Sequence, residues 1–300
     1  MNTNTAEFPS IQSATRTELK LGLPKGRMSE GVIALLRDAG ISVTSRGREY
    51  RPDVSFPNTT AKVLKPHDII EMLSRGSRDI GFAGADWVIE LQSDVVEILD
   101  TELDPVRLVV ATPASFELPE KSSPRRIAVV SEYERITRRW ITQSELNAEF
   151  IRSYGATEVF PPDDADVIVD NVATGSTLAA NNLVVRDTLM TSSTRLYASP
   201  IAMDQPDIRA RIEDLTLLLK SVLEARRRVV LEINADSDSL QTIVTLLPSM
   251  REATVSPLFD NTGYAIRAAV PRTSLAELLP ALKLAGGTDI VVSSPDQIIA

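Results

Sequence analysis

Residues 19–40 read LKLGLPKGRMSEGVIALLRDAG, in which a short apolar run is followed by an amphipathic segment. The run Leu19–Leu23 is typical of a buried strand, and the apolar residues between 32 and 36 recur at the spacing of a helix face. Ser29 and Gly40 are suited to the start and the end of that helix. The segment therefore predicts a βα unit, the building block of α/β proteins.

The same alternation continues to residue 228. Strands are predicted over 61–64, 80–84, 107–112, 127–130, 165–170 and 182–186, with a further apolar run at 195–199, and helices over 67–74, 137–154 and 206–228. A polar, proline-bearing stretch over 113–126 interrupts the pattern. We therefore expect two lobes, lobe I from 19–114 and 195–228 and lobe II from 115–194, preceded by a flexible tail over 1–18.

The chain after residue 228 has an arrangement of its own. Strands are predicted over 228–234, 253–258, 263–270 and 289–293, and helices over 238–247 and 274–285. The order βαββαβ is that of a ferredoxin-like domain. We expect an independent module from 229 to 300, and such modules commonly bind effectors or partners.

Charge and residue usage exclude several classes of function. The 300 residues carry 32 basic and 41 acidic side chains, a net charge of −9, which argues against binding to nucleic acid or to an anionic membrane. The lack of cysteine excludes disulfides and cysteine nucleophiles, and a single histidine, His67, excludes a multi-histidine metal site. Because the first residues lack the apolar core of a signal peptide, we expect a cytoplasmic protein.

Residues 166–178 read DVIVDNVATGSTL, an apolar strand that ends near an acidic residue and runs into a turn of small residues. The turn contains Thr174, Gly175, Ser176 and Thr177. Such residues can present backbone N–H groups and hydroxyls to a phosphate, especially at the start of a helix. Asp170 at the strand end is suited to a ribose hydroxyl or to hydrated magnesium. The alternative is a plain turn with a helix N-cap, because serine and threonine are common there.

Further motifs occur in order along the chain: LPKGR at 23–27, IGFAGAD at 80–86, RLVVATP at 107–113, ITRRW at 136–140, GATE at 155–158 and SSTRL at 192–196. Together with DNVATGSTL at 170–178, they resemble the ATP phosphoribosyltransferase family, whose members catalyse the first step of histidine biosynthesis. The tail resembles the regulatory domain of the long form of that family. The resemblance implies a bilobed catalytic part like the type II periplasmic binding proteins, with substrates between the lobes.

The resemblance also implies a reaction and roles for residues. The phosphoribosyl group of phosphoribosyl pyrophosphate is transferred to N1 of ATP, with release of pyrophosphate. The loop from Ala173 to Thr177 would hold the 5′-phosphate and Asp170 the ribose hydroxyls. Lys25 and Arg27 would face the phosphates, with Gly26 allowing a tight loop between them. Mg²⁺ would be held mainly by substrate and water, with no dedicated protein ligands.

Three further charged positions have two interpretations each. Arg48, with Arg46 and Arg51, forms a basic cluster that is either a solvated face or an electrostatic funnel for the substrates. Glu158 resembles a family acidic position near the ribose and the metal, and the alternative is a surface carboxylate. Arg138 and its neighbour Arg139 would either reach phosphates or cap their helix. For Lys25 and Arg27 in LPKGR, the alternative is that they are solvated charges in an exposed turn.

The loop departs from the family pattern at two positions. Asn171 stands where the family more often has an aliphatic residue, and Ala173 stands where serine is common. The second change removes one hydroxyl that could contact phosphate, although the backbone amide remains. The rest of the loop is intact, so we do not infer an inactive relative.

The resemblance extends to regulation and assembly. It implies dimers or hexamers, and histidine as a feedback inhibitor bound between regulatory domains, with Asn234 and Thr254 as candidate contacts. The competing hypothesis is a non-catalytic sensor of the same bilobed fold, which closes on an anionic ligand and uses the tail as its output. Turnover in the presence of both substrates distinguishes the two.

Overall fold

The computed structural model describes residues 17–45, 50–259 and 261–299. The strands are β1 (Leu19–Pro24), β2 (Val43–Thr44), β3 (Asp53–Val54), β4 (Thr59–Leu64), β5 (Ile80–Gly84), β6 (Val96–Pro113), β7 (Ile127–Ser131), β8 (Ala148–Arg152), β9 (Val167–Val172), β10 (Leu183–Ala198), β11 (Arg228–Ala235), β12 (Thr254–Pro257), β13 (Tyr264–Pro271) and β14 (Thr288–Ser293). The helices are α1 (Met28–Asp38), α2 (Pro66–Ser74), α3 (Ala85–Leu91), α4 (Glu134–Gln143), α5 (Ser176–Ala180), α6 (Pro200–Met203), α7 (Pro206–Arg227), α8 (Ser237–Leu246) and α9 (Leu275–Leu284), with the short 3₁₀ helices η1 (Thr157–Val159) and η2 (Arg272–Ser274).

Two of the sequence expectations fall outside these ranges. Arg48, together with Arg46, is not among the described residues, and neither is the tail up to residue 16. The described residues form two compact units, one within Met1–Ser29 and Thr44–Glu213, the other within Glu30–Val43 and Asp214–Ala300. The bounds proposed above for the two lobes and the tail domain stay predictions.

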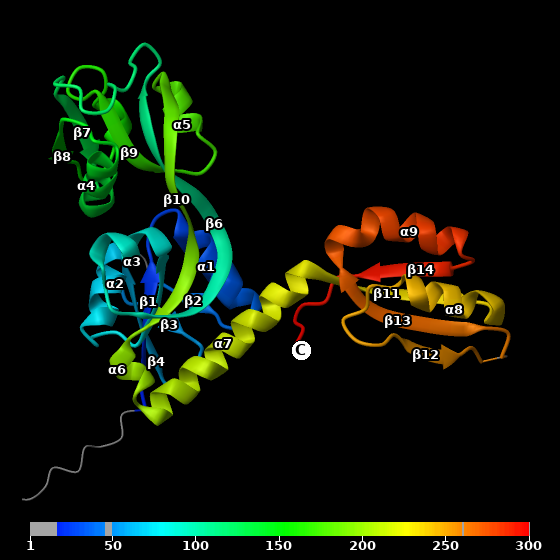
Figure 1. Ribbon diagram of the computed structural model, residues 1–300. Coiled ribbons are helices and arrows are strands. Elements are labelled where there is room, and N and C mark those ends of the chain that lie inside the picture. Colours follow the sequence, from blue (N-terminus) through cyan, green and yellow to red (C-terminus); the bar gives the residue numbers. More distant parts are fainter. Residues whose placement is uncertain (1–16, 46–49, 260, 300) are drawn as a thin grey trace, which may run out of the picture. The chain divides into compact units, whose positions relative to one another are not determined.

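The first unit is built on one eight-stranded sheet in the order β4-β1-β5-β10-β6-β9-β7-β8 (Figure 1). The strands β4, β1 and β5 are parallel to one another, as are β8, β7 and β9. The two long antiparallel strands β6 and β10 run between these two groups. Helices pack on both groups, with Ile69 and Leu73 of α2 in one core and Ile136 and Trp140 of α4 in another. The expected bilobed α/β fold is confirmed.

The strands β6 and β10 are longer than the sequence predicts. The expected strands over 107–112 and 182–186 and the run at 195–199 are parts of two strands, paired from Leu183 opposite Pro113 to Ala198 opposite Val96. The strand β6 contains the polar segment DTELD at 100–104, so a search for apolar runs does not detect its full length. Pairing with β10 keeps this segment in the strand, although Glu102 and Asp104 have φ values of 58° and 49° where the pairing shifts register.

The helix expected over 137–154 is wrong in its second half. The helix α4 ends at Gln143, and the chain turns through Glu145, whose φ is 55°, into strand β8. That strand pairs in parallel with β7, from Ala148 opposite Ile127 to Arg152 opposite Ser131. A short segment with few apolar residues fits a helix or a strand equally well, and here the neighbouring strand determines the outcome.

The second unit contains a four-stranded antiparallel sheet in the order β12-β13-β11-β14, with α8 and α9 on one face (Figure 1). Val229, Leu231 and Ile233 of β11 are buried in the core with residues of both helices. Glu232, between them, is exposed, so the opposite face of the sheet is open. The expected ferredoxin-like arrangement is confirmed.

Candidate active site

The loop 173–177 joins the end of β9 to α5. Since β9 is fully buried from Val167 to Val169, the core fixes the position of its end. Gly175 turns the chain with a φ of 83°, a left-handed conformation that favours glycine, and α5 begins at the next residue. Thr174 Oγ1 lies 3.0 Å from Ser176 Oγ. The strand and the turn expected over 166–178 are present, and a helix begins directly after Gly175.

This loop presents several unused hydrogen-bond donors. In the part of the chain that the structure describes, no protein acceptor is paired with the backbone amides of Thr177 and Leu178, which lie in the first turn of α5. The side chains of Thr174, Ser176 and Thr177 are exposed. Because α5 is only five residues long, its dipole is small, and the amides and hydroxyls themselves make the loop suitable for phosphate.

The loop lines a cavity of about 260 Å³, the loop cavity. Besides the loop residues Ala173–Thr177, this cavity is lined by Arg27, Glu158 and Asp170. The structure therefore brings together side chains from three segments that the sequence singled out separately.

Asp170 is anchored in the wall of this cavity. Its Oδ2 accepts a hydrogen bond from the hydroxyl of Thr157, and its Oδ1 accepts one from the backbone N–H of Asn171 at 2.7 Å. Burial raises the pKa of Asp170 above its ordinary value, and the neighbouring carboxylates Glu132 and Glu158 act in the same direction, against the two hydrogen bonds. A carboxylate in this position is a well-placed acceptor for hydroxyl groups of a ligand.

The loop Lys25–Arg27 follows β1 and leads into α1. The backbone N–H of Lys25 donates to the carbonyl of Leu64 at 2.9 Å, and that of Ser29 donates to the carbonyl of Gly26 at 3.0 Å. Gly26 has a φ of 81°, so the tight loop expected between the two cations is formed. Both cationic side chains are exposed, and Arg27 Nη1 donates to the carbonyl of Asp104 at 3.4 Å.

A second cavity, of about 240 Å³, lies next to the first and is called here the β10 cavity. Its lining includes Lys25, Arg27, Asp86, Trp87, Asp104, Asn171 and Ser192–Thr194. Arg27 and Asn171 line both cavities. Ligands that fill the two cavities are therefore neighbours.

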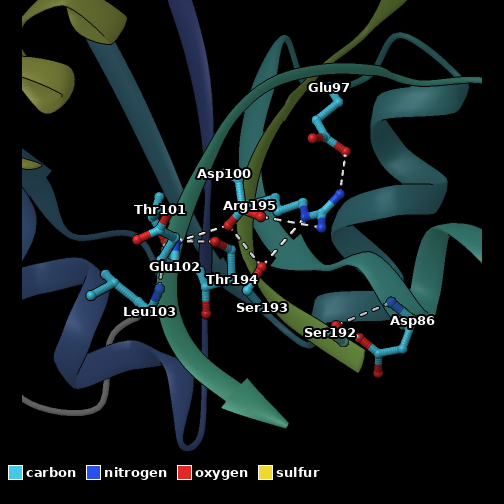
Figure 2. Close-up of polar contacts among 10 residues, drawn as sticks. All are labelled: Asp86, Glu97, Asp100, Thr101, Glu102, Leu103, Ser192, Ser193, Thr194 and Arg195. Atoms are coloured by element: carbon cyan, nitrogen blue, oxygen red, sulfur yellow. Dashed lines mark hydrogen bonds and ion pairs between the residues drawn. The ribbon is translucent and has the colours of Figure 1, made fainter. Parts of the chain in front are cut away.

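The β10 wall of this cavity is held by polar contacts to α3 and β6, which Figure 2 shows. Ser192 Oγ donates to Asp86 Oδ1 at 2.6 Å, and Ser193 Oγ donates to Asp100 Oδ1 at 2.7 Å. Arg195 forms ion pairs with Glu97 at 2.8 Å and with Asp100 at 3.1 Å. These contacts fix the wall where β6 and β10 shift register.

Sequence reasoning gave no role to Asp86, Tyr133 or Ser192. Two of them lie in motifs quoted above, IGFAGAD and SSTRL, and that is the signal that could have identified them. Arg138 pairs with Glu134 of its own helix and lies over the ring of Phe150, and it does not line either cavity.

The candidate contacts in the second unit lie on one face of its sheet. Asn234 of β11 is opposite Ala265 of β13, and Thr254 of β12 is opposite Arg267 of the same strand. Residues two apart on a strand point to the same side. Asn234 and Thr254 therefore share the open face, across β13 from each other.

The donor set does not suggest a dedicated metal cage. Within residues 17–45, 50–259 and 261–299, no group of three or more His, Cys, Asp or Glu side chains could hold a metal ion. None of the helices in these ranges is long and apolar enough to cross a membrane.

Comparisons with known proteins agree with this geometry. The ATP phosphoribosyltransferase family matches residues 65–221, and the HisG C-terminal domain matches residues 225–295. An ATP phosphoribosyltransferase of Pelotomaculum thermopropionicum is 36% identical over 279 residues, covering 91% of this chain and 96% of that protein. One of Chlorobium phaeobacteroides is 33% identical, covering 94% and 97%. A chain of the ATP phosphoribosyl transferase (HisG:HisZ) complex from Thermotoga maritima has a TM-score of 0.59 and 25% identity, over 67% of this chain and 98% of that one.

The bilobed fold and these matches define a pentosyltransferase with an additional C-terminal domain. The chain belongs to the ATP phosphoribosyltransferase family, in the long form, and is an enzyme of histidine biosynthesis that acts on ATP and phosphoribosyl pyrophosphate. The transferase predicted from the sequence is thus confirmed, and the comparisons give no support to a non-catalytic sensor.

Proposed function

We propose that the loop cavity holds phosphoribosyl pyrophosphate and that the β10 cavity holds ATP, with N1 of adenine directed at C1 of the ribose. The observation that carries this proposal is the sharing of Arg27 and Asn171 by the two cavities. Two substrates bound side by side react as if at a very high effective concentration, which is the main contribution that such an enzyme makes.

The loop cavity accounts for the binding of the phosphoribosyl group. The amides of Thr177 and Leu178 and the hydroxyls of the loop donate to the 5′-phosphate, while Asp170 accepts from ribose hydroxyls. The lone pair of N1 forms a bond to C1 as the bond from C1 to the pyrophosphate oxygen breaks. The bonding electrons leave with pyrophosphate, and the configuration at C1 is inverted. The carboxylate of Asp170 stabilises the positive charge that develops on the ribose.

The cations of the Lys25–Arg27 loop neutralise phosphate charge at the boundary of the two cavities. Lys25 lines the β10 cavity and Arg27 lines both, so the first is placed for the triphosphate and the second for the departing pyrophosphate. We assign Arg48 the same kind of role, from the sequence alone. No protein nucleophile is required, because N1 is itself nucleophilic.

We propose Mg²⁺ as the cofactor. As the family resemblance implies, the ion would be held mainly by pyrophosphate oxygens and water. Glu158 and Asp170 line the same cavity and are placed to hydrogen-bond to water on the ion. Bound Mg²⁺ supplies charge neutralisation to the leaving group.

We propose that histidine inhibits through the C-terminal domain. Asn234 and Thr254 lie on the open face of its sheet, and an exposed face of this kind is suited to a ligand or to a second copy of the domain. A dimer or hexamer, and a cytoplasmic location, follow from the same family resemblance.

The reaction is tested by ultraviolet absorbance of the N1-substituted adenine. Phosphoribosyl pyrophosphate alone, ATP alone, and both together with Mg²⁺ are each incubated with the enzyme. The absorbance is expected to grow only in the complete mixture. Saturable binding of both substrates without any growth in absorbance would contradict the proposed reaction and favour a sensor.

A further inference from the structure

Asn171 occupies a particular place in the site. It is exposed, it follows Asp170 on β9, and it lines the loop cavity and the β10 cavity alike. An aliphatic residue at this position could only fill space there. An amide can form hydrogen bonds to a ligand, provided that its orientation is fixed.

Two buried residues fix that orientation. Asn171 Nδ2 lies 2.9 Å from the hydroxyl oxygen of Tyr133, which in turn lies 2.6 Å from Asp86 Oδ2. Since a carboxylate has no proton to give, the hydroxyl of Tyr133 donates to Asp86 and can only accept from Asn171. An amide turned the other way would place two oxygen acceptors against each other. Tyr133 is 0% exposed and Asp86 5% exposed, so water does not compete for these contacts.

Further contacts hold Tyr133 and Asp86 in place. Asp86 Oδ1 accepts from Ser192 Oγ at 2.6 Å, and the backbone N–H of Asp86 donates to the same Oγ at 3.2 Å (Figure 2). The ring of Trp87 stacks on that of Tyr133 with centroids 4.7 Å apart. A series of hydrogen bonds thus runs from Ser192 through Asp86 and Tyr133 to Asn171. The first three of these residues are held in place by the contacts described above.

The amide oxygen of Asn171 is left as an acceptor. Over the described residues, no protein donor is paired with Asn171 Oδ1, whereas one of the two N–H groups of the amide nitrogen donates to Tyr133. Two ligand groups at the boundary of the cavities carry donors of the right kind: the exocyclic amine of adenine and the ribose hydroxyls. The hydroxyls already have Asp170 as an acceptor. The amine is attached to the ring carbon next to N1, so a hydrogen bond to it also directs N1.

We infer that Asn171 is a specificity-determining residue, whose amide oxygen, oriented by Tyr133 and Asp86, accepts a hydrogen bond from the exocyclic amine of ATP. This inference rests on the proposed placement of the two substrates. Tyr133 and Asp86 act as positioning residues, because they reach the nucleotide only through Asn171.

The test removes the hydrogen-bond donor, the exocyclic amine of ATP, and the acceptor, the amide oxygen of Asn171, in separate measurements. Purine riboside 5′-triphosphate keeps a free N1 but lacks the exocyclic amine. Its dissociation constant and that of ATP are measured by calorimetry, without the second substrate, for the wild type and for Asn171→Leu. The wild type is expected to prefer ATP by about 3- to 10-fold, the range of one neutral hydrogen bond. Asn171→Leu should bring this ratio close to one by weakening ATP alone.

Two further variants separate recognition from structure. Tyr133→Phe keeps the ring but frees the amide to turn, so it should lower the preference for ATP in the same way. A role confined to stability would weaken both nucleotides equally. Asn147→Leu, at an exposed position that lines neither cavity, makes the same chemical change and should leave the ratio unchanged.

Three outcomes would overturn the inference. A ratio unchanged in Asn171→Leu, with weaker binding of phosphoribosyl pyrophosphate, would assign the oxygen to the ribose hydroxyls. A ratio unchanged with both affinities intact would leave Asn171 without a ligand. If the wild-type enzyme bound neither nucleotide, the substrate placement itself would fail, and this outcome is distinct from the other two.

Discussion

The hydroxyl of Tyr133, the residue that precedes α4, donates to Oδ2 of Asp86 in the first turn of α3 at 2.6 Å. The contact thus connects α4, which packs on β7, to α3, which follows β5. The strands β7 and β5 belong to the two different parallel groups of the sheet. Burial, and then the charge of Asp86, raise the pKa of Tyr133 well above that of an ordinary tyrosine.

Tyr133 is expected to make stability fall in alkaline solution. An unfolded tyrosine loses its proton near pH 10, whereas Tyr133 keeps it in the folded protein. The raised pKa therefore contributes stability that is present below pH 10 and is lost as the pH rises beyond it. Urea unfolding at neutral and strongly alkaline pH should show a smaller alkaline loss for Tyr133→Phe than for the wild type. An equal loss in both proteins would show that Tyr133 titrates normally.

Gly84 is expected to be intolerant of any side chain. A Cβ at this position would overlap with Asp86 Oδ1 and would lie 3.2 Å from Ser192 Oγ. Gly84→Ala should therefore lower the free energy of unfolding by roughly 1–3 kcal/mol, the usual cost of overpacking. In an Asp86→Ala background the clash is absent, and the cost should be smaller. The same cost in both backgrounds, measured by urea unfolding, would argue against this explanation.

Asp170→Asn is expected to lower kcat more than it lowers the affinity for phosphoribosyl pyrophosphate. The variant keeps the shape of the side chain and removes the charge that stabilises the transition state, while the phosphate contacts remain. Because the pKa of Asp170 is raised, wild-type kcat should fall on acidification at a higher pH than for an ordinary aspartate, and this step should be missing in the variant. Unchanged kcat would remove Asp170 from the reaction.

Histidine inhibition is expected to depend on the open face of the second sheet. Asn234→Ala and Thr254→Val together should raise the histidine concentration for half inhibition by at least 10-fold, with kcat in the absence of histidine unchanged. Removal of the chain after Arg228 should abolish inhibition, provided that the shortened protein remains folded. Thr245→Val, on α8 outside the sheet, serves as the control. Full sensitivity in both altered proteins would place the inhibitor elsewhere.

The parts of the fold that sequence predicts well are those with a local signal. The unit of β1 and α1 follows from its apolar spacing, and the turn at Gly175 follows from residues that favour it. The contact of Asp86 with Ser192 joins positions 106 apart in the sequence, and it exists only because β10 pairs with β5 in one register. The length of β6 and the strand β8 likewise depend on partner strands that no local pattern describes.

The most direct test of the substrate placement is the binding of each substrate to Thr177→Val. Thr177 lines the loop cavity and not the β10 cavity, so the variant removes a hydroxyl from one site alone. A hydrogen bond to a charged group contributes roughly 1.5–3 kcal/mol, or about 10- to 150-fold in affinity. Calorimetry should show a loss of this size for phosphoribosyl pyrophosphate, with ATP affinity and melting temperature unchanged. Equal losses for the two substrates, or a loss for ATP alone, would contradict the account.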